Sequence, residues 1–140
     1  MKHFFDHEPR TKVRCHNEDG LIYVDYKMSY SPKRFRALLD TGDKGCLSLS
    51  NEHFTLCSDS TTNPYASAFK SQVTGQRRTT IAGVNGRVKQ GITALTIKQF
   101  RIGRKTFHDL PAATTNNEDK FGIKFLEHST IIIRKSQIEL

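Results

Sequence analysis

The amino-acid sequence predicts a mainly β fold, and three observations support that class. Apolar and polar residues alternate along Leu21–Tyr30, which is the period of a strand with one buried face. Turn signals recur between such segments, and Asn85-Gly86 is the dipeptide most typical of a two-residue β-hairpin. The apolar segments follow one another through short turns, a pattern that favours hairpins over strand–helix–strand units.

Length and composition limit the class of protein further. The chain has 140 residues, of which 36% are hydrophobic and 26% charged. One domain of ordinary size accounts for this length, so an enzyme whose active site lies between two long halves of one chain is excluded. The longest apolar run near the end, Ile131–Ile133, is strand-sized, and we expect no membrane span. Residues 1–15 lack the apolar core of a signal peptide, so we expect a cytoplasmic protein, or a periplasmic or membrane-anchored one if a leader was removed.

The first half of the chain predicts an arm, a hairpin and one short strand. Residues 1–18 are polar without periodicity and are predicted to form an N-terminal arm before a domain at residues 19–140. The strand at Leu21–Tyr30 and a second one at Arg34–Asp40 make a hairpin. A short apolar strand follows at Cys46–Leu49. The polar stretch Thr55–Gln72 is predicted to be an irregular excursion or to hold one short helix.

The second half predicts further hairpins and one helix. Strands resume at Thr79 and turn at Asn85-Gly86 and again at Gly103-Arg104. Apolar residues at helical spacing favour one short helix in Phe121–His128. Two short strands around Arg134-Lys135 are expected at the end.

The segment with the most informative chemistry is Asp40-Thr41-Gly42, which ends an apolar strand. The strand would carry the Asp40 carboxylate into a buried place, and the Thr41 hydroxyl can hold the loop by a hydrogen bond. Gly42 lets the backbone turn where a side chain would clash. The tripeptide alone is a weak signal, because the same three residues after a strand often form only a turn.

The order of the elements resembles that of the retropepsin-like aspartic proteases, single-domain relatives of pepsin that include retroviral proteases and bacterial gag-polyprotein-type aspartyl proteases. A paired-strand start leads into Asp40-Thr41-Gly42, and a glycine-bearing hairpin follows at Ile81–Gly86. The string Phe121–Leu126 looks like the bacterial family's Leu-Gly-x-x-Phe-Leu element. The resemblance covers residues 20–140, and it implies a closed β-barrel of the acid-protease type with one short C-terminal helix.

The resemblance also implies an activity and an oligomeric state. In this family two aspartates share a proton and a water molecule; one acts as the base that activates the water and the other as the acid. The chain has a single Asp-Thr-Gly, so the second aspartate would come from another copy in a symmetric homodimer. The expected function is an aspartic endopeptidase that hydrolyses peptide bonds through two Asp40 residues without a cofactor. Thr41 would bond across the dimer, and the carbonyl of Gly42 would accept a hydrogen bond from the bound peptide.

Two further segments receive roles from the resemblance. The hairpin residues Ala82, Gly83, Val84, Asn85 and Gly86 would form a flap that closes over the peptide and excludes water. A plain surface hairpin at Asn85-Gly86 remains the alternative. Phe121 and Gly122 would lie close to the site as structural residues.

Three features depart from the family pattern. Asp43 follows the tripeptide where Ala or Ser is usual, and a third carboxylate near the pair would disfavour further ionisation. Lys120 occupies the first of two positions that are usually apolar before Gly122. The stretch Thr55–Gln72 is long and polar for its place.

The distribution of charge suggests a second reading. The formal net charge is +8, and residues after Lys70 carry +7 of it. Nucleic-acid binding would interleave exposed aromatic residues with the cations, but Phe100 and Phe107 alternate as core residues do, so nucleic acid is disfavoured and an acidic peptide or partner is expected. The alternative function is a catalytically inactive retropepsin-fold dimerisation or binding module with an acidic partner.

The cysteine and histidine residues suggest no metal site or cysteine chemistry. Cys46, His53 and Cys57 lie close in sequence but lack the repeated close spacing of a four-ligand zinc site, so no metal is expected. No nucleophile signature surrounds any of the three cysteines, and no phosphate-binding glycine loop occurs. Reduced thiols are the expected state, although Cys46 and Cys57 could close one disulfide loop.

Overall fold

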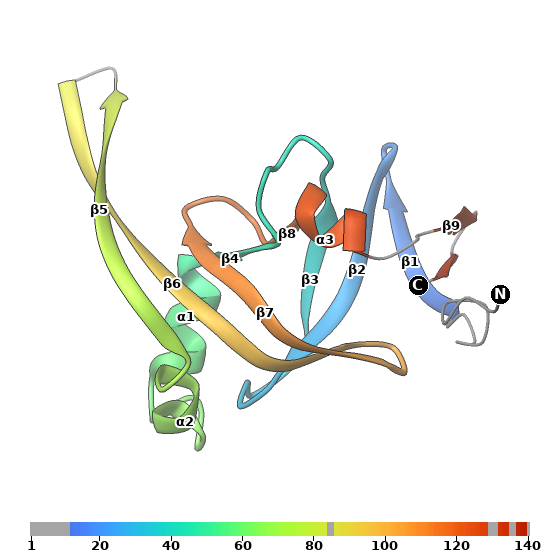
Figure 1. Cartoon of the computed structure of the whole chain (residues 1–140), viewed down its shortest axis with the longest axis horizontal. Helices are drawn as coiled ribbons and strands as arrows, with labels where there is room; N and C mark the ends of the chain where they lie inside the picture. The colour runs from blue at the N-terminus through green and yellow to red at the C-terminus, as the bar shows by residue number, and fades with distance from the viewer. Residues whose placement is uncertain (1–11, 84–85, 129–131, 135–136, 140) are drawn as a thin grey trace, which may run out of the picture.

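The computed structural model describes residues 12–83, 86–128, 132–134 and 137–139, and Figure 1 shows their arrangement. The strands in these ranges are β1 (Lys12–Glu18), β2 (Leu21–Met28), β3 (Phe35–Leu39), β4 (Leu47–Ser50), β5 (Val73–Gly83), β6 (Gly86–Ile102), β7 (Lys105–Thr115), β8 (Lys120–Phe121), β9 (Ile132–Arg134) and β10 (Gln137–Glu139). The helices are α1 (Asn51–Ser58), α2 (Ala66–Lys70) and α3 (Ile123–His128).

Six of these strands close into a barrel, which confirms the predicted retropepsin-like β-barrel class. Around the barrel the order is β2, β3, β8, β4, β7 and β6, and β6 returns to β2 at Met28↔Phe100. The strand β8 pairs in parallel with β3 and antiparallel with β4. The strand β8 is only two residues long. Because it pairs with both β3 and β4, it holds together the two ends of the loop that connects them.

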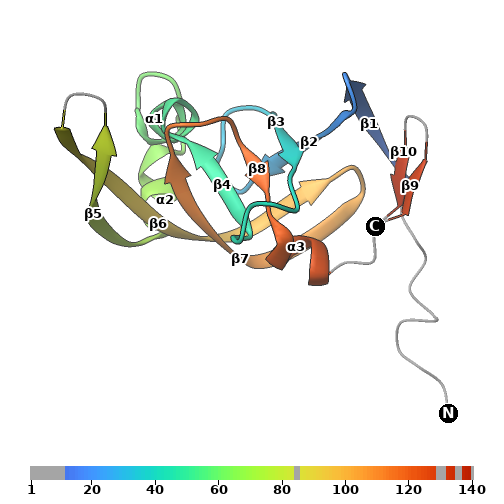
Figure 2. The same cartoon turned by 90° about the horizontal axis from the view of Figure 1, so that it is seen from above.

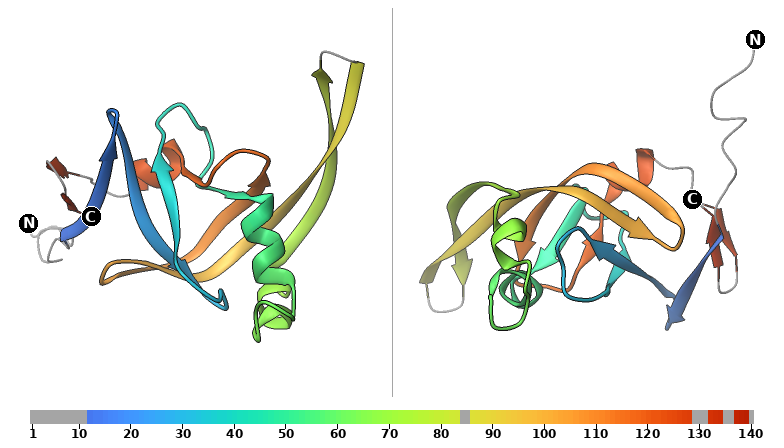
Figure 3. Two further views of the ribbon diagram at one scale, coloured as in Figure 1. Left: turned by 180° about the vertical axis from the view of Figure 1, so that it is seen from behind. Right: turned by 90° about the horizontal axis from the view of Figure 1, so that it is seen from below.

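Two extensions leave the barrel at opposite ends of the molecule. The hairpin of β5 and β6 projects at one end, and β1, β10 and β9 form a small sheet at the other (Figures 2 and 3). The strand β1 belongs to both parts, since Cys15–Glu18 pair with β2 and residues 12–14 pair with β10. Residues 12–18, which were expected to be part of a polar arm, therefore form a strand: residues 12–14 pair with distant β10 and Cys15–Glu18 pair with neighbouring β2.

The barrel core follows the alternation seen in the sequence. Val24, Tyr26 and Met28 of β2 all point inward and are at most 1% exposed. Aromatic rings dominate the centre, where the rings of Phe121 and Phe125 lie 4.5 Å apart. Burying side chains of this size contributes about 1.5–3 kcal/mol each relative to leaving them exposed.

The stretch predicted as an irregular excursion or one helix contains α2 and the second half of α1. The hydroxyl of Ser50 caps α1 by accepting a hydrogen bond from the His53 backbone N–H at 3.1 Å. Between the helices, the buried amide of Asn63 donates to the carbonyl oxygens of Tyr30 and Cys57. These bonds fasten the two helices to the turn between β2 and β3, so the segment is an ordered part of the fold.

The remaining elements agree with the sequence apart from their boundaries. The hairpins β2–β3, β5–β6 and β6–β7 are all antiparallel, as predicted. The strand β5 starts at Val73, earlier than the predicted Thr79, and α3 forms within the predicted Phe121–His128. No helix in the described part of the chain is long and apolar enough to cross a membrane.

Candidate active site

Asp40 stands directly after β3, where its carboxylate is oriented but not buried. Its backbone N–H donates to the Phe121 carbonyl at 2.9 Å, which fixes the end of the strand. One carboxylate oxygen, Oδ1, accepts from the Gly42 backbone N–H at 2.9 Å, and Oδ2 lies 3.4 Å from the Lys120 ammonium. The side chain remains 31% exposed. This carboxylate therefore has a defined direction and an open side for a reactant.

The two residues after Asp40 suit the roles that the resemblance implies. A side-chain carbon at Gly42 would come within 3.1 Å of Asp40 Oδ1, closer than nearly all such contacts, so glycine lets the backbone approach the carboxylate. Thr41 is exposed and stands beside the acid on the same loop. Its side chain is available to a second molecule.

Asp43 is part of the architecture of the loop. Its Oδ1 accepts from the Gly45 N–H at 2.8 Å and its Oδ2 from the Ser48 hydroxyl at 3.0 Å. Its carbonyl accepts from the Ile123 N–H at 2.7 Å at the start of α3. The sequence predicted that a third carboxylate near the expected pair would disfavour further ionisation; in the structure its two oxygens accept hydrogen bonds within the loop.

Gly122 lets the backbone after β8 lie directly against the backbone of the Asp40–Cys46 loop. Its N–H donates to the Cys46 carbonyl at 2.8 Å. A side-chain carbon at this position would lie 2.3 Å from the Gly45 carbonyl oxygen and 2.7 Å from that of Asp43, distances that no real side chain tolerates. Phe121 beside it is fully buried. The expected structural role of Phe121 and Gly122 near the site has a geometric basis: they hold the Asp40–Cys46 loop against α3.

The predicted flap lies partly within the described residues. Ala82 and Gly83 belong to β5 and Gly86 to β6, with Gly83 paired to Gly86, while Val84 and Asn85 lie outside the described residues. The outer end of this hairpin and the loop after β3 rise on the same side of the barrel (Figure 1).

A second aspartate, which the sequence did not single out, is buried behind the site. The Asp119 side chain is 0% exposed. Its carboxylate accepts from the Tyr26 hydroxyl and the Ser50 backbone N–H, each at 2.7 Å, and shares a 2.7 Å hydrogen bond with His53 Nδ1. The His53 ring in turn stacks on Phe35 at 4.0 Å between centroids. No local signal separates Asp119 from its polar neighbours, because its partners come from residues far away in the chain.

The thiol groups of Cys46 and Cys57 lie in partly or fully buried positions. Burial, and next the charge of Asp119, raise the pKa of Cys57 to about 12, and burial raises the pKa of Cys46. Both thiols thus stay protonated at neutral pH and are poor nucleophiles. All three cysteines are free. Within the described residues no group of three or more His, Cys, Asp or Glu side chains could hold a metal ion.

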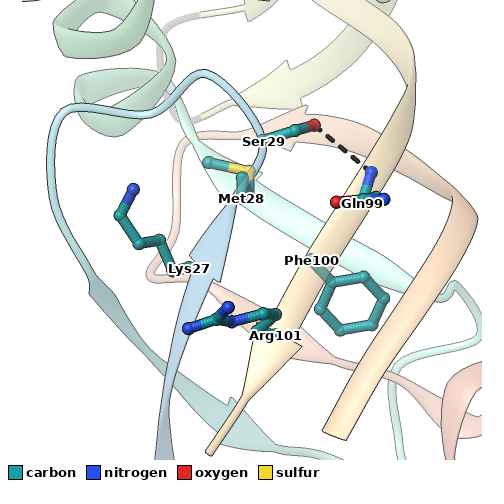
Figure 4. Close-up of a pocket in the computed structure, with 6 residues that line it drawn as sticks. All are labelled: Lys27, Met28, Ser29, Gln99, Phe100 and Arg101. Carbon is teal, nitrogen blue, oxygen red and sulfur yellow. Dashed lines mark hydrogen bonds between the residues drawn. The ribbon is translucent and has the colours of Figure 1, made fainter. Parts of the chain in front are cut away.

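A separate pocket lies at the seam where β2 meets β6, and Figure 4 shows its six lining side chains. It measures about 300 Å³, and the Ser29 hydroxyl accepts from the Gln99 N–H at 3.3 Å within it. Lys27 and Arg101 are its charged residues. The described residues that line it include no carboxylate, in contrast to the Asp40 loop.

Comparison with known proteins supports the fold. No family model and no curated protein sequence matches the chain. Among solved structures, it is similar to a retropepsin-like aspartic protease from Rickettsia conorii, with 16% sequence identity and a TM-score of 0.52 over 94% of this chain and 89% of that one. At this identity the likeness shows the retropepsin-like fold.

Proposed function

We propose that the protein is an aspartic endopeptidase of retropepsin type that acts as a homodimer. The observation that carries this proposal is the Asp40 carboxylate: it ends a barrel strand, its Oδ1 is held by the Gly42 N–H, and it keeps an open side. The retropepsin-like neighbour supports the same class of chemistry. The carboxylate and the fold together support peptide hydrolysis as the proposed activity.

The second carboxylate would come from a second copy of the chain. In the described part of the structure, the Asp40 carboxylate contacts the Gly42 backbone N–H and the Lys120 ammonium, and these contacts include no other carboxylate. The carboxylate of the buried Asp119 already has three hydrogen-bond partners, so it is not available as the second catalytic carboxylate. A two-fold axis beside the exposed Thr41 would bring two Asp40 side chains face to face, because a two-fold interface pairs each residue with its own mate.

The proposed reaction uses a water molecule held between the two carboxyl groups. One carboxylate takes a proton from the water as it attacks the peptide carbonyl, and the protonated mate donates a proton to the carbonyl oxygen. The tetrahedral intermediate then collapses when the amide nitrogen receives a proton and leaves. The β5–β6 hairpin is proposed to close over the peptide and keep bulk water out of the site.

The test is Asp40→Asn in a preparation whose oligomeric state is measured by analytical ultracentrifugation. We expect a dimeric wild type that cleaves a peptide library and is blocked by a statine-type transition-state mimic. The variant should keep the dimer and lose at least about 10³-fold in kcat/KM, the scale of a general acid–base residue. Asp25→Asn, an exposed acid on β2, serves as the matched control and should leave kcat/KM unchanged.

Equal cleavage by the wild type and Asp40→Asn would overturn the assignment. A protein that cleaves nothing but binds acidic partners, with affinity that falls steeply as salt is added, would instead be the inactive binding module.

A further inference from the structure

Lys120 stands on the same face of the barrel wall as Asp40. In the parallel pairing of β3 and β8, Leu38 is opposite Lys120 and Leu39 is opposite Phe121. Side chains alternate along a strand, so Asp40 shares its face with Leu38 and Lys120 while Phe121 points into the core. Pairing of β8 with both β3 and β4 fixes the Lys120 backbone in place.

The side chain of Lys120 reaches the candidate catalytic group itself. Its ammonium lies 3.4 Å from Asp40 Oδ2, and its side chain is 25% exposed. This spacing is at the long end for a charge-assisted hydrogen bond. An ion pair that remains partly in water is weak, because solvent screens it, so the ammonium can exchange Asp40 for another anion.

In the proposed dimer, the Asp40 pair does not match the charge of the lysines beside it. Two Asp40 carboxyl groups that share one proton carry a single negative charge, while the two Lys120 ammonium groups carry two positive charges. The Asp43 carboxylates are also negative, but their oxygens accept from the Gly45 N–H and the Ser48 hydroxyl within the loop. Each Lys120 ammonium is thus only partly compensated by the Asp40 pair and can attract a further anion.

We propose that Lys120 is a specificity-determining residue that selects peptides with Asp or Glu next to the scissile bond. This inference rests on the proposed peptidase function and names the substrate class of that site. The substrate carboxylate takes the place of Asp40 as the partner of Lys120. Asp40 is then released to share its proton with the second Asp40. An acidic substrate thus supplies the binding contact and a partner for the Lys120 charge.

The experiment measures binding separately from cleavage. Two statine-containing peptides that differ only in Glu or Gln before the statine are titrated into the full-length protein by calorimetry. We expect the wild type to bind the Glu peptide more tightly by on the order of tenfold, the scale of a charge-assisted hydrogen bond. Lys120→Met should bring the two affinities close to equality, and Lys120→Arg should keep the preference. Lys120→Glu should reverse the preference toward a peptide that carries Lys at that position.

The matched control is Lys124→Met. Lys124 is an exposed lysine on the neighbouring helix α3, and its backbone N–H, which the substitution retains, donates to Gly45. This variant should keep the full Glu preference. For cleavable peptides, the same preference is expected in kcat/KM, and circular dichroism confirms that each variant is folded.

Equal binding of the two peptides by the wild type, or an unchanged preference in Lys120→Met, would overturn the inference. Cleavage that depends on Asp40 but shows no Glu preference overturns this inference alone. Selective binding that depends on Lys120 in a protein that never cleaves supports the recognition by Lys120 and removes the peptidase function.

Discussion

Asp40 and Asp119 lie at the two ends of the same short strand pairing, and their surroundings are opposite. Asp40 follows β3, is 31% exposed, and leaves part of its carboxylate without a protein partner. Asp119 precedes β8, is fully buried, and has three partners at 2.7 Å. A buried carboxylate with all its partners in place stabilises a fold, whereas an oriented and partly open one can bind and react. The contrast assigns a stabilising role to Asp119 and supports the proposed catalytic role of Asp40.

The strongest test of the contrast makes the same substitution at each aspartate. Asp119→Asn should lower the free energy of unfolding by about 4 kcal/mol, because buried donors from Tyr26, Ser50 and His53 would lose a charged acceptor. Asp40→Asn should change the free energy of unfolding by less than about 1 kcal/mol, because its ion pair is partly exposed. Urea denaturation monitored by circular dichroism measures both. Equal stability losses would remove the distinction.

The next largest effect on stability is expected at Gly122, where the backbone lies against the Asp40–Cys46 loop. Gly122→Ala should destabilise the protein by about 3 kcal/mol, because the new methyl group would meet the Gly45 and Asp43 carbonyl oxygens at 2.3 and 2.7 Å. Gly91→Ala in β6 is the control, since a side-chain carbon there meets nothing within 4 Å. Thermal unfolding should separate the two variants clearly, and similar melting temperatures would contradict the close approach.

The buried thiol of Cys57, whose pKa is raised by burial and next by the Asp119 charge, predicts a loss of stability at alkaline pH. The pKa of Cys57 rises from 9.0 to about 12 in the folded protein, through burial and next through the Asp119 charge. The unfolded chain then loses the thiol proton above pH 9 while the folded protein keeps it. The free energy of unfolding should therefore fall by about 1.4 kcal/mol per pH unit between pH 9 and 12 from this group.

Cys57→Ala tests this alkaline loss. It should remove that part of the slope in urea titrations at several pH values, whereas its stability near pH 7 reflects only lost packing. A slope that is the same in both proteins would show that the folded thiol titrates normally.

The smallest effect is expected at the third aspartate. Asp43→Asn keeps an oxygen for the Gly45 N–H, and its amide can donate to the Ser48 hydroxyl, so the loop should retain its shape. We expect stability within about 1 kcal/mol of wild type and kcat/KM within a few-fold. A large gain in kcat/KM would mean that the Asp43 charge does act on the catalytic pair.

The sequence predicted the parts of the fold that depend on local patterns. Alternation along Leu21–Tyr30 and the turn at Asn85-Gly86 identified the hairpins, and the abrupt end of an apolar strand identified Asp40. The α1 helix was missed because its apolar pattern is weak, and Cys57 is its one fully buried residue. The Ser50 cap was a usable signal for it.

Long-range pairing explains the rest of what the sequence could not reveal. The strand β1 depends on β10 at the other end of the chain. Lys120 stands beside Asp40 only because β8 pairs in parallel with β3. The partners of Asp119 include Tyr26, 93 positions earlier in the chain. Periodicity and turn chemistry depend on residues that are close in sequence, so they do not predict contacts between residues that are far apart in the chain.

The two-residue strand β8 also determines when the Asp40 loop can take its final form during synthesis. It fills the gap between β3 and β4, which are made of residues near position 40, with residues at positions 120 and 121. Such distant pairings form late and slowly, because a long loop must close first. Asp40 therefore leaves the ribosome long before its supporting wall exists. The Asp40 loop of a nascent chain would therefore lack this support until Gly122 has emerged.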